Sequence, residues 1–273
     1  MKDILDEIIA NKRVEVYQAN QEMPLDVLQD LVEKKIKQDG AVKLRSMRQS
    51  LEQSKSGIIS EFKRKSPSKG WIHEDASPLD VVPKYAAGGA SAISILTDKK
   101  FFGGELEFIR SVRPLVDTPI LRKDFIIDEY QLFEARLVGA DAVLLIAADL
   151  EIGRVYELTN KAHELGLEVL LEVHDPSELE YVKAVPQVDM LGVNNRALGT
   201  FHTDVQHSFD IAEAMKEAAT GQLLVSESGI GNPEVVRKLR EVGFRGFLIG
   251  ENFMKESDPG EALKQFINDI EQH

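Results

Sequence analysis

The sequence predicts a (β/α)8 barrel, the TIM-barrel architecture, preceded by an N-terminal helical extension. Short apolar runs recur along the chain without alternation of polar and apolar residues, which is typical of parallel strands buried on both faces. Patterns of helical periodicity separate these runs, so that strand and helix alternate at intervals of roughly 20–35 residues. Several helix-to-strand junctions share one glycine-containing form, namely AAGGASAISI, LVGADAVLLI and EVGFRGFLIG, in which the glycine suits a helix C-cap.

The expected strands and helices alternate in order from residue 57. The strands are Gly57–Glu61, Ala90–Leu96, Pro119–Leu121, Ala142–Ile146, Glu168–Glu172, Met190–Val193, Leu223–Ser226 and Gly246–Ile249. The helices are Leu79–Ala87, Leu106–Val112, Glu129–Val138, Ile152–Leu165, Ser177–Lys183, Val205–Ala218, Pro233–Val242 and Gly260–Ile270. A doubly wound open sheet is the competing fold, but its first strand normally leads into a glycine-rich fingerprint. Lysines follow the first strand here, which favours the barrel.

The first 50 residues read as helices and contain no strand candidate. Apolar residues recur there at helical spacing, at Ile4, Leu5, Ile8, Ile9, Leu25, Leu28, Leu31 and Val32. We therefore expect a helical extension over residues 1–50, packed on a barrel over residues 51–273, with both parts forming a single domain. The sequence leaves open whether the extension closes over a ligand or only caps the barrel.

Composition and charge exclude several classes of partner. The 273 residues are 43% hydrophobic and 29% charged, as in ordinary globular proteins, and the formal net charge of −13 argues against nucleic acid and anionic membranes. The absence of cysteine excludes disulfides, thiolate metal sites and a cysteine nucleophile. The start of the chain has no secretory signal, and no apolar stretch reaches about 20 residues. We expect a cytoplasmic protein without nucleic-acid or membrane partners and take a monomer as the working state, although the sequence leaves the oligomeric state open.

Polar and charged residues follow directly after most of the apolar runs, at the strand ends where barrel enzymes carry their chemistry. These ends are Glu61, Lys63 and Ser66; Thr97 to Gly104; Arg122 to Phe125; Glu172 to His174; Asn194 to Arg196; Ser226 to Gly229; and Gly250 to Asn252. Strand ends are polar in any barrel, but surface charge has no need to lie beside the core. The convergence of lysines and glutamates therefore favours a ligand site.

The last two strand ends predict a phosphate site. Gly229 and Gly231 lie between a strand and a helix for which Asn232 is the expected N-cap, and Gly250 follows the eighth strand. Backbone N–H groups at glycine turns and helix N-termini bind anions, and these two loops are the usual phosphate site of the fold. We therefore expect a phosphorylated ligand with Lys63 as an added contact, and tight-turn geometry alone is the alternative.

The other end of the ligand is inferred from Lys123, Glu172, Glu61 and Asn194. A lysine and two glutamates in one enclosed mouth can have pKa values pushed toward neutrality, which suits a general acid and a general base. A Schiff base on Lys63 or Lys123 is an alternative, but both lysines have carboxylates as expected neighbours.

Two further readings concern the same mouth. Phe102 and Phe125 lie close to the rim, where they could grip an aromatic group or belong to the plain core. A metal site made of Glu61, Glu172 and Glu227 is an alternative, but the interleaved lysines make a cation superfluous, and we expect neither metal nor cofactor.

Seven stretches of the chain together resemble the indole-3-glycerol phosphate synthase family of tryptophan-pathway barrels. They are IISEFKRKSPSKG, ISILTDKKFFGG, PILRKDFIIDEYQ, EVLLEVHD, LGVNNRAL, LVSESGI and FLIGENFM, between Ile58 and Met254. No single stretch is specific, but their combination is, and the helical extension fits as well. The resemblance implies a lyase that converts 1-(2-carboxyphenylamino)-1-deoxyribulose 5-phosphate to indole-3-glycerol phosphate with loss of carbon dioxide and water, without a cofactor.

The resemblance also implies catalytic roles. Lys123 is similar to the general acid that protonates the ketone oxygen during ring closure, and Glu172 to the general base of the later dehydration. Lys63 resembles the lysine that pairs with anionic groups of the substrate, and which lysine donates each proton stays open. Glu61 and Asn194 resemble the groups that hold the substrate hydroxyls and orient the lysines.

A further set of residues is similar to the family's substrate-binding residues. They are Arg196 and Ser66 around the substrate carboxylate and the mobile first loop, Phe102 and Phe125 in the aromatic pocket wall, and Glu227, Ser228, Gly229 and Gly250 at the phosphate end. Glu251 departs from members that have serine beside the phosphate. Because an inward carboxylate would repel phosphate, we expect the backbone N–H of Glu251 to face the ligand.

These expectations divide the stretch from Ile58 to Gly70. Glu61 and Lys63 belong to the chemistry, Arg64 and Lys65 are solvated charge, and Ser66 to Gly70 is a mobile gating loop. Two other functions are weighed against the synthase. A barrel like phosphoribosylanthranilate isomerase would use a cysteine that this chain lacks, and a non-catalytic phosphosugar-binding barrel would not need paired lysines and glutamates.

Overall fold

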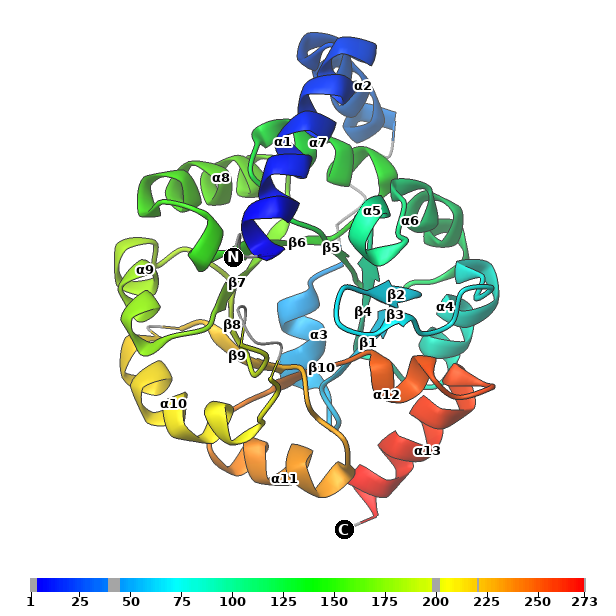
Figure 1. Ribbon diagram of the computed structural model, residues 1–273, viewed down its shortest axis with the longest axis vertical. Helices are drawn as coiled ribbons and strands as arrows, with labels where there is room; N and C mark the ends of the chain where they lie inside the picture. Colours follow the sequence, from blue (N-terminus) through cyan, green and yellow to red (C-terminus); the bar gives the residue numbers. More distant parts are fainter. Residues whose placement is uncertain (1–3, 39–44, 198–201, 220, 273) are drawn as a thin grey trace.

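A computed structural model describes residues 4–38, 45–197, 202–219 and 221–272 of the chain. Parallel strands form a closed barrel in the order β1-β10-β9-β8-β7-β6-β5-β4 inside a ring of helices (Figure 1). The strands are β1 (Ile58–Phe62), β4 (Ala92–Leu96), β5 (Ile120–Lys123), β6 (Ala142–Ile146), β7 (Glu168–Val173), β8 (Met190–Asn194), β9 (Leu223–Glu227) and β10 (Gly246–Ile249). The predicted (β/α)8 barrel is confirmed.

A covering helix follows each barrel strand. These helices are α4 (Pro78–Ala87), α6 (Leu106–Val112), α7 (Glu129–Val138), α8 (Ile152–Glu164), α9 (Leu179–Ala184), α10 (Gln206–Ala218), α11 (Pro233–Glu241) and α13 (Pro259–Glu271). The helix expected at Ser177–Lys183 instead begins with a 3-10 turn, η3 (Pro176–Glu178), because the Asp175 side chain accepts the Ser177 N–H and tightens the chain there. None of the helices in the described ranges has the length and apolar character needed to cross a membrane.

The barrel interior is filled by side chains at every second strand position. Its apolar core consists of Met47, Leu51, Ile59, Ala92, Leu121, Ala142, Leu144, Ile146, Leu170, Met190, Leu223, Val225 and Leu248. Because the side-chain period is two, the inward position after Ile59 is Glu61, and the one after Leu121 is Lys123. The same step brings Glu172 and Glu227 inward at the carboxyl ends of β7 and β9, and thus creates a polar mouth on an apolar core.

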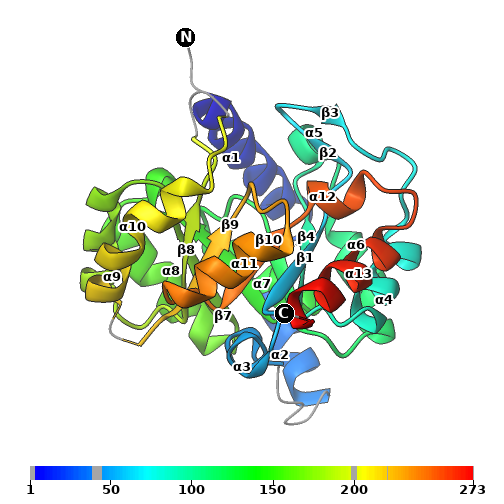
Figure 2. The same ribbon diagram turned by 90° about the horizontal axis from the view of Figure 1, so that it is seen from below.

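The N-terminal residues reach both ends of the barrel. α1 (Ile4–Glu22) lies across the mouth, α2 (Leu25–Gln38) packs beside α7, and α3 (Met47–Gln53) closes the opposite end (Figures 1 and 2). The carboxylate of Glu168 at the start of β7 accepts the Ser46 hydroxyl and the Arg48 N–H, which fixes the start of α3. The boundary expected between residues 50 and 51 falls inside α3, and residues 1–3 and 39–44 lie outside the described ranges, so this division of the chain stays a prediction.

The segment after β1 forms a short hairpin, and the mobility and gating expected of Ser66 to Gly70 stay a prediction. β2 (Lys65–Ser66) and β3 (Gly70–Trp71) pair antiparallel at the mouth, on the same end of the barrel as α1 (Figure 2). Arg64 is also more than solvated charge. Its guanidinium donates to the Gly103 carbonyl at 2.7 Å and lies 5.0 Å from the ring centroid of Phe108, which ties the base of the hairpin to the turn after β4.

A buried lysine anchors α1 to the barrel. Lys12 Nζ lies 2.8 Å from Asp124 Oδ1, 3.0 Å from Asp98 Oδ2 and 2.6 Å from Glu15 Oε2. Burial opposes the charge on Lys12, but Asp124 and Asp98 outweigh it and raise the pKa of the lysine. Asp124 also accepts the Thr97 hydroxyl at 2.6 Å, and burial is again outweighed, chiefly by Lys12, so that the pKa of Asp124 falls to about 2. Lys12, Asp98 and Asp124 depend on one another because all three are buried away from water.

We predict that Lys12→Met destabilises the fold. The methionine keeps the apolar stem but leaves Asp98 buried without its cation and Asp124 with Arg122 alone, at 3.1 Å. Loss of one partner of a buried ion pair costs about 3–5 kcal/mol. Urea unfolding followed by circular dichroism measures the change. The matched control is Lys37→Met, since Lys37 forms an exposed pair with Glu33 at 3.5 Å, for which a change of about 0.5 kcal/mol or less is expected. Equal unfolding midpoints for Lys12→Met and the wild type would contradict the role of this anchor.

Candidate active site

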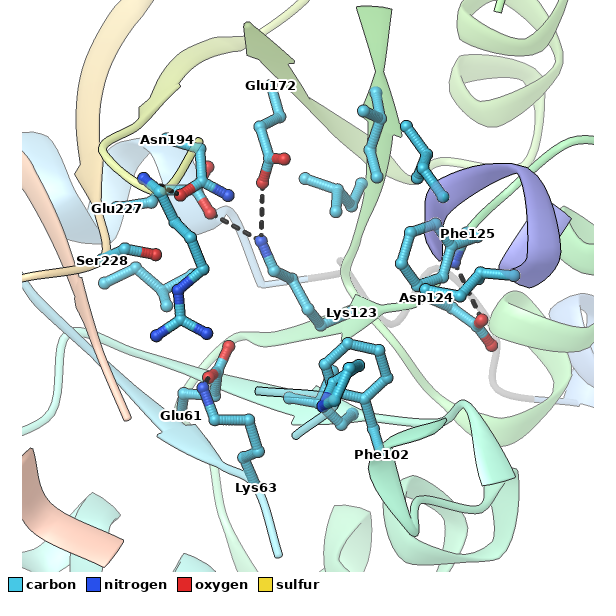
Figure 3. A pocket seen from close by; sticks show the side chains of 18 of the residues that line it. Glu61, Lys63, Phe102, Lys123, Asp124, Phe125, Glu172, Asn194, Glu227 and Ser228 are labelled. Carbon is cyan, nitrogen blue, oxygen red and sulfur yellow. Dashed lines mark hydrogen bonds and ion pairs between the residues drawn. The ribbon is translucent and has the colours of Figure 1, made fainter. Parts of the chain in front are cut away.

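Lys123 lies at the centre of the barrel mouth between two carboxylates. Its Nζ is 2.9 Å from Glu172 Oε2 and 2.6 Å from Glu227 Oε2, as Figure 3 shows. The three side chains come from the ends of β5, β7 and β9 and point toward one another. The structure brings Lys123 and Glu172 together as the sequence predicted, whereas the catalytic role of each residue stays a prediction.

The two carboxylates on Lys123 differ in protonation. For Glu172, burial is outweighed by Lys123 and His174, which lower the pKa to about 2. For Glu227, burial dominates, Glu172 adds repulsion, and the pKa rises to about 8 despite Lys123. Burial of Lys123 itself is outweighed by Glu172 and Glu227, and its pKa is raised. One ammonium cannot neutralise two buried carboxylates, so near neutral pH Lys123 and Glu172 are charged while Glu227 holds a proton.

A second lysine–glutamate pair lies across the mouth. Lys63 Nζ is 2.6 Å from Glu61 Oε1, and both side chains project from the end of β1 (Figure 3). Burial would raise the pKa of Glu61, but Lys63 and then Lys123 outweigh it and lower that pKa. Asn194, at the end of β8, bonds the Glu172 carboxylate by its side chain. Asn194 thus lies against Glu172, whereas its expected role in holding the substrate hydroxyls and orienting the lysines stays a prediction.

Two glycines make room for these carboxylates. A Cβ at Gly192 on β8 would lie 2.4 Å from Glu227 Oε1, and one at Gly250 would lie 2.6 Å from Glu61 Oε1. Sequence reasoning missed Gly192, because nothing in LGVNN marks a strand glycine as the neighbour of a carboxylate on the next strand. Gly250 was expected at a phosphate, and it also gives Glu61 its space.

An apolar wall borders the same mouth. The rings of Phe102, from α5 (Lys99–Phe102), and Phe125 lie 6.0 Å apart between centroids at 38° to one another. Ile4, Leu5 and Ile8 of α1 line the pocket beside them. Sequence reasoning placed these three residues in a helical extension but had no signal that they face the site.

A second hollow adjoins the first at the ends of β9 and β10. Glu61, Lys63, Arg196 and Ser228 line both hollows, so a single ligand can occupy the two together. Gly229, Gly250 and Glu251 line only the second hollow. Ser228 and Gly229 have consecutive positive φ values of 68° and 75°, a backbone form that turns successive N–H groups to one side.

Cations partly offset the carboxylate of Glu251 beside this hollow. Glu251 begins α12 (Glu251–Met254), and its oxygens lie 3.6 Å from Lys69 Nζ and 3.9 Å from an Arg196 nitrogen. Arg196 also donates to Thr203 Oγ1 and Ser68 Oγ, each at 3.2 Å. Arg196 therefore links the loop after β8 to the hairpin and to α12.

Two predicted binding residues lie elsewhere than expected. Glu227 was assigned to the phosphate end, but it points inward at the end of β9 and its carboxylate is on Lys123. Ser66 was assigned to substrate contact, but it is buried in β2, its hydroxyl accepts the Lys69 N–H at 3.3 Å, and it lines neither hollow. Glu227 points inward because side chains alternate along β9 with a period of two. Ser66 is buried because it forms part of the hairpin. Within the described ranges, no group of three or more histidines, aspartates and glutamates is arranged to hold a metal ion.

We predict opposite stability effects for the two amides Glu227→Gln and Glu172→Gln. The folded pKa of Glu227 lies above its unfolded value of about 4.3, so the native state binds the extra proton and loses stability as pH rises from about 4 toward 8. Glutamine resembles the protonated acid, so Glu227→Gln should be more stable than the wild type, increasingly so toward pH 8. Glu172 has a folded pKa below its unfolded value and stabilises above about pH 4, so Glu172→Gln should be less stable.

Thermal unfolding of both variants at pH 5, 7 and 8 measures these changes. The pair is internally matched because each amide replaces one carboxylate on the same lysine. Destabilisation by Glu227→Gln that grows with pH would contradict a protonated Glu227 beside an ionised Glu172.

Comparisons with known proteins agree with this geometry. The sequence model of a family described as indole-3-glycerol phosphate synthase matches residues 5–266. An indole-3-glycerol phosphate synthase of Bacteroides thetaiotaomicron is 58% identical over 271 residues, covering 99% of this chain and 100% of the relative. One of Polaromonas sp. is 40% identical over 267 residues, covering 98% of this chain and 99% of the relative.

A solved structure supports the fold independently. A mutant tryptophan synthase alpha-subunit of Pyrococcus furiosus matches with a TM-score of 0.59 at 17% identity, over 80% of this chain and 98% of that one. A match at such low sequence identity supports the barrel fold and nothing further. The family match, by contrast, extends over both hollows and the N-terminal helices, and it confirms the resemblance found in the seven sequence stretches. The chain belongs to the indole-3-glycerol phosphate synthase family.

Proposed function

We propose that the barrel mouth closes the indole ring of 1-(2-carboxyphenylamino)-1-deoxyribulose 5-phosphate, with Lys123 as the acid and Glu172 as the base. The reaction loses carbon dioxide and water, which makes the protein a carboxy-lyase of tryptophan biosynthesis. The single observation that carries the proposal is the contact of Lys123 with Glu172 at 2.9 Å inside a mouth bordered by an aromatic wall and by the turn at Ser228 and Gly229.

The charge states suit these roles. Lys123 stays protonated, so it can stabilise negative charge that develops on the ketone oxygen and donate a proton to it. Glu172 is ionised and can accept the proton removed as the hydroxyl leaves. Lys63 borders both hollows and is the alternative proton donor, with Glu61 holding its ammonium at 2.6 Å.

The two hollows suit the two ends of this substrate. The carboxyphenyl ring fits the wall made by Phe102, Phe125 and α1, and the phosphate fits the turn at Ser228 and Gly229. Holding both ends brings the ring carbon to the carbonyl, and such orientation can be worth up to about 7–11 kcal/mol. Because one chain supplies both hollows, we propose that it acts as a monomer, which sedimentation in solution tests.

We predict that Lys123→Ala lowers turnover by orders of magnitude, because the charged donor at the ketone oxygen is lost. Near-ultraviolet absorbance of the indole product, after addition of the carboxyphenylamino-deoxyribulose phosphate, measures the rate. Lys99→Ala is the matched control, since Lys99 is exposed and pairs with Glu105 at 3.4 Å outside both hollows. Wild-type protein that releases no indole product would contradict the function, and an active Lys123→Ala would contradict the role of Lys123.

We also predict that Gly229→Ala weakens the binding of inorganic phosphate by about tenfold or more, as loss of a well-placed anion contact costs about 1.5–3 kcal/mol. Its φ of 75° disfavours a side chain, and the added Cβ would lie 2.7 Å from Thr203 Cγ2, so the turn must shift. Calorimetric titration measures the affinity. Gly153→Ala on α8 is the control, because its Cβ meets no atom within 4 Å. If Gly229→Ala binds inorganic phosphate with the same affinity as the wild type, the phosphate does not bind at this turn.

A further inference from the structure

His174 is a half-buried histidine with both ring nitrogens shielded from solvent, and it has no part in the acid–base chemistry proposed for Lys123 and Glu172. Its Nε2 lies 3.2 Å from Glu172 Oε1, the carboxylate oxygen that Lys123 does not hold. Within the described ranges neither ring nitrogen forms a hydrogen bond of normal geometry, so the approach of Nε2 to Glu172 is a close polar contact and not an aligned hydrogen bond. Burial of an imidazole in this state costs free energy that a leucine of similar size would avoid. An unsatisfied buried polar group in a native structure calls for an explanation other than stability.

The backbone around His174 fixes where its ring lies. The His174 N–H donates to Glu178 Oε2 at 2.6 Å, and the His174 carbonyl accepts from His207 Nε2 at 2.8 Å. Glu178 lies in η3 and His207 in α10, so two separate elements hold the residue just after β7. The backbone of His174 is therefore fixed at a point from which its ring reaches Glu172.

The groups that face Glu172 come from four strands. Lys123 of β5 contacts Oε2, Asn194 of β8 bonds the carboxylate, and Glu227 of β9 shares the lysine. His174, directly after β7, contacts Oε1 at 3.2 Å. A carboxylate held at one oxygen alone can rotate about its terminal torsion, whereas contact at both oxygens fixes its plane.

We propose that His174 is a positioning residue for Glu172, which fixes the second carboxylate oxygen and keeps this carboxylate oriented as the base. The proposal rests on the proposed synthase function and on the role of Glu172 within it. His174 and Lys123 both favour the ionised form of Glu172, so the pKa of Glu172 rises when His174 is removed. As the pH falls, Glu172 then becomes protonated at a higher pH than in the wild type and can no longer accept a proton. The acidic limb of the kcat profile therefore moves to higher pH.

Two substitutions of His174 test the proposal. His174→Leu removes the polar contact, and His174→Gln keeps an amide nitrogen at a similar reach. We expect kcat of His174→Leu to fall about 10- to 100-fold, as for a misplaced catalytic group, with KM changed less than about threefold. The acidic limb of its kcat profile should shift to higher pH. His174→Gln should recover most of the lost turnover and also carries the test if the leucine variant does not fold.

A double-mutant cycle separates positioning from a general structural effect. In a Glu172→Gln background, His174→Leu should cause no further loss of turnover, because the group it positions is gone. His163→Gln is the control for loss of a histidine, since His163 pairs with Asp189 at 2.9 Å outside both hollows and its kcat should equal that of the wild type.

Three outcomes would overturn the proposal, and each is distinguishable from failure of the proposed function. An unchanged kcat and pH profile in His174→Leu, while Glu172→Gln is inactive, overturns the role of His174 alone. A glutamine variant as slow as the leucine variant also overturns it. Full activity of Glu172→Gln would show that Glu172 is not the base, and this measurement needs no substitution at His174. Failure of the function would appear in wild-type protein as the absence of indole product.

Discussion

The site depends on one buried constraint, which is a single ammonium, Lys123, between the carboxylates of Glu172 and Glu227. Burial makes every charge costly, so the cluster settles into unequal protonation states instead of three full charges. The difference is chemically useful because an ionised carboxylate and a charged lysine coexist in contact, ready to accept and to donate. Gly192 belongs to this constraint as much as the charged groups do, since any side chain there would displace Glu227 from the lysine.

The strand that carries Lys123 also holds the N-terminal helix in place. Lys123, the last residue of β5, points into the barrel mouth, and Asp124 directly after it points away from Lys123 (Figure 3). Alternation along the strand turns Arg122 outward as well. Asp124 pairs with Lys12 of α1 at 2.8 Å, and Arg122 donates to the Gln131 carbonyl of α7 at 2.6 Å. Because these three residues are consecutive, the position of Lys123 is coupled to the position of α1, which forms part of the wall of the aromatic hollow. Displacement of α1 would expose both the apolar wall and the buried carboxylate of Asp124, next to Lys123.

The sequence predicted the barrel and the meeting of Lys123 with Glu172, because parallel strand ends converge whatever their exact register. It did not predict which inward residues share a partner. In the sequence, Glu227 comes directly after the expected strand and therefore looks like a loop residue. In the structure β9 extends to Glu227, and this places its side chain against Lys123. Lys12 lies on a helix among other charged residues, and its partner Asp124 is more than 100 residues away, so no local pattern marks the pair. Ser66 was misplaced for a related reason, since turn residues gave no sign of the hairpin that buries it.

The hairpin after β1 is held firmly at its base and weakly at its tip. At the base, Arg64 donates to the Gly103 carbonyl at 2.7 Å, and Trp71 covers Gly103 so closely that a Cβ there would lie 2.8 Å from the ring. At the tip, Ser68 accepts from Arg196 at 3.2 Å and Lys69 lies 3.6 Å from Glu251, both exposed contacts that contribute little. A phosphate in the adjoining hollow offers Arg196 and Lys69 a stronger partner than either has without it. We therefore expect the proposed phosphate to act on the tip of the hairpin, while the base and the Glu61–Lys63 pair before it keep their geometry.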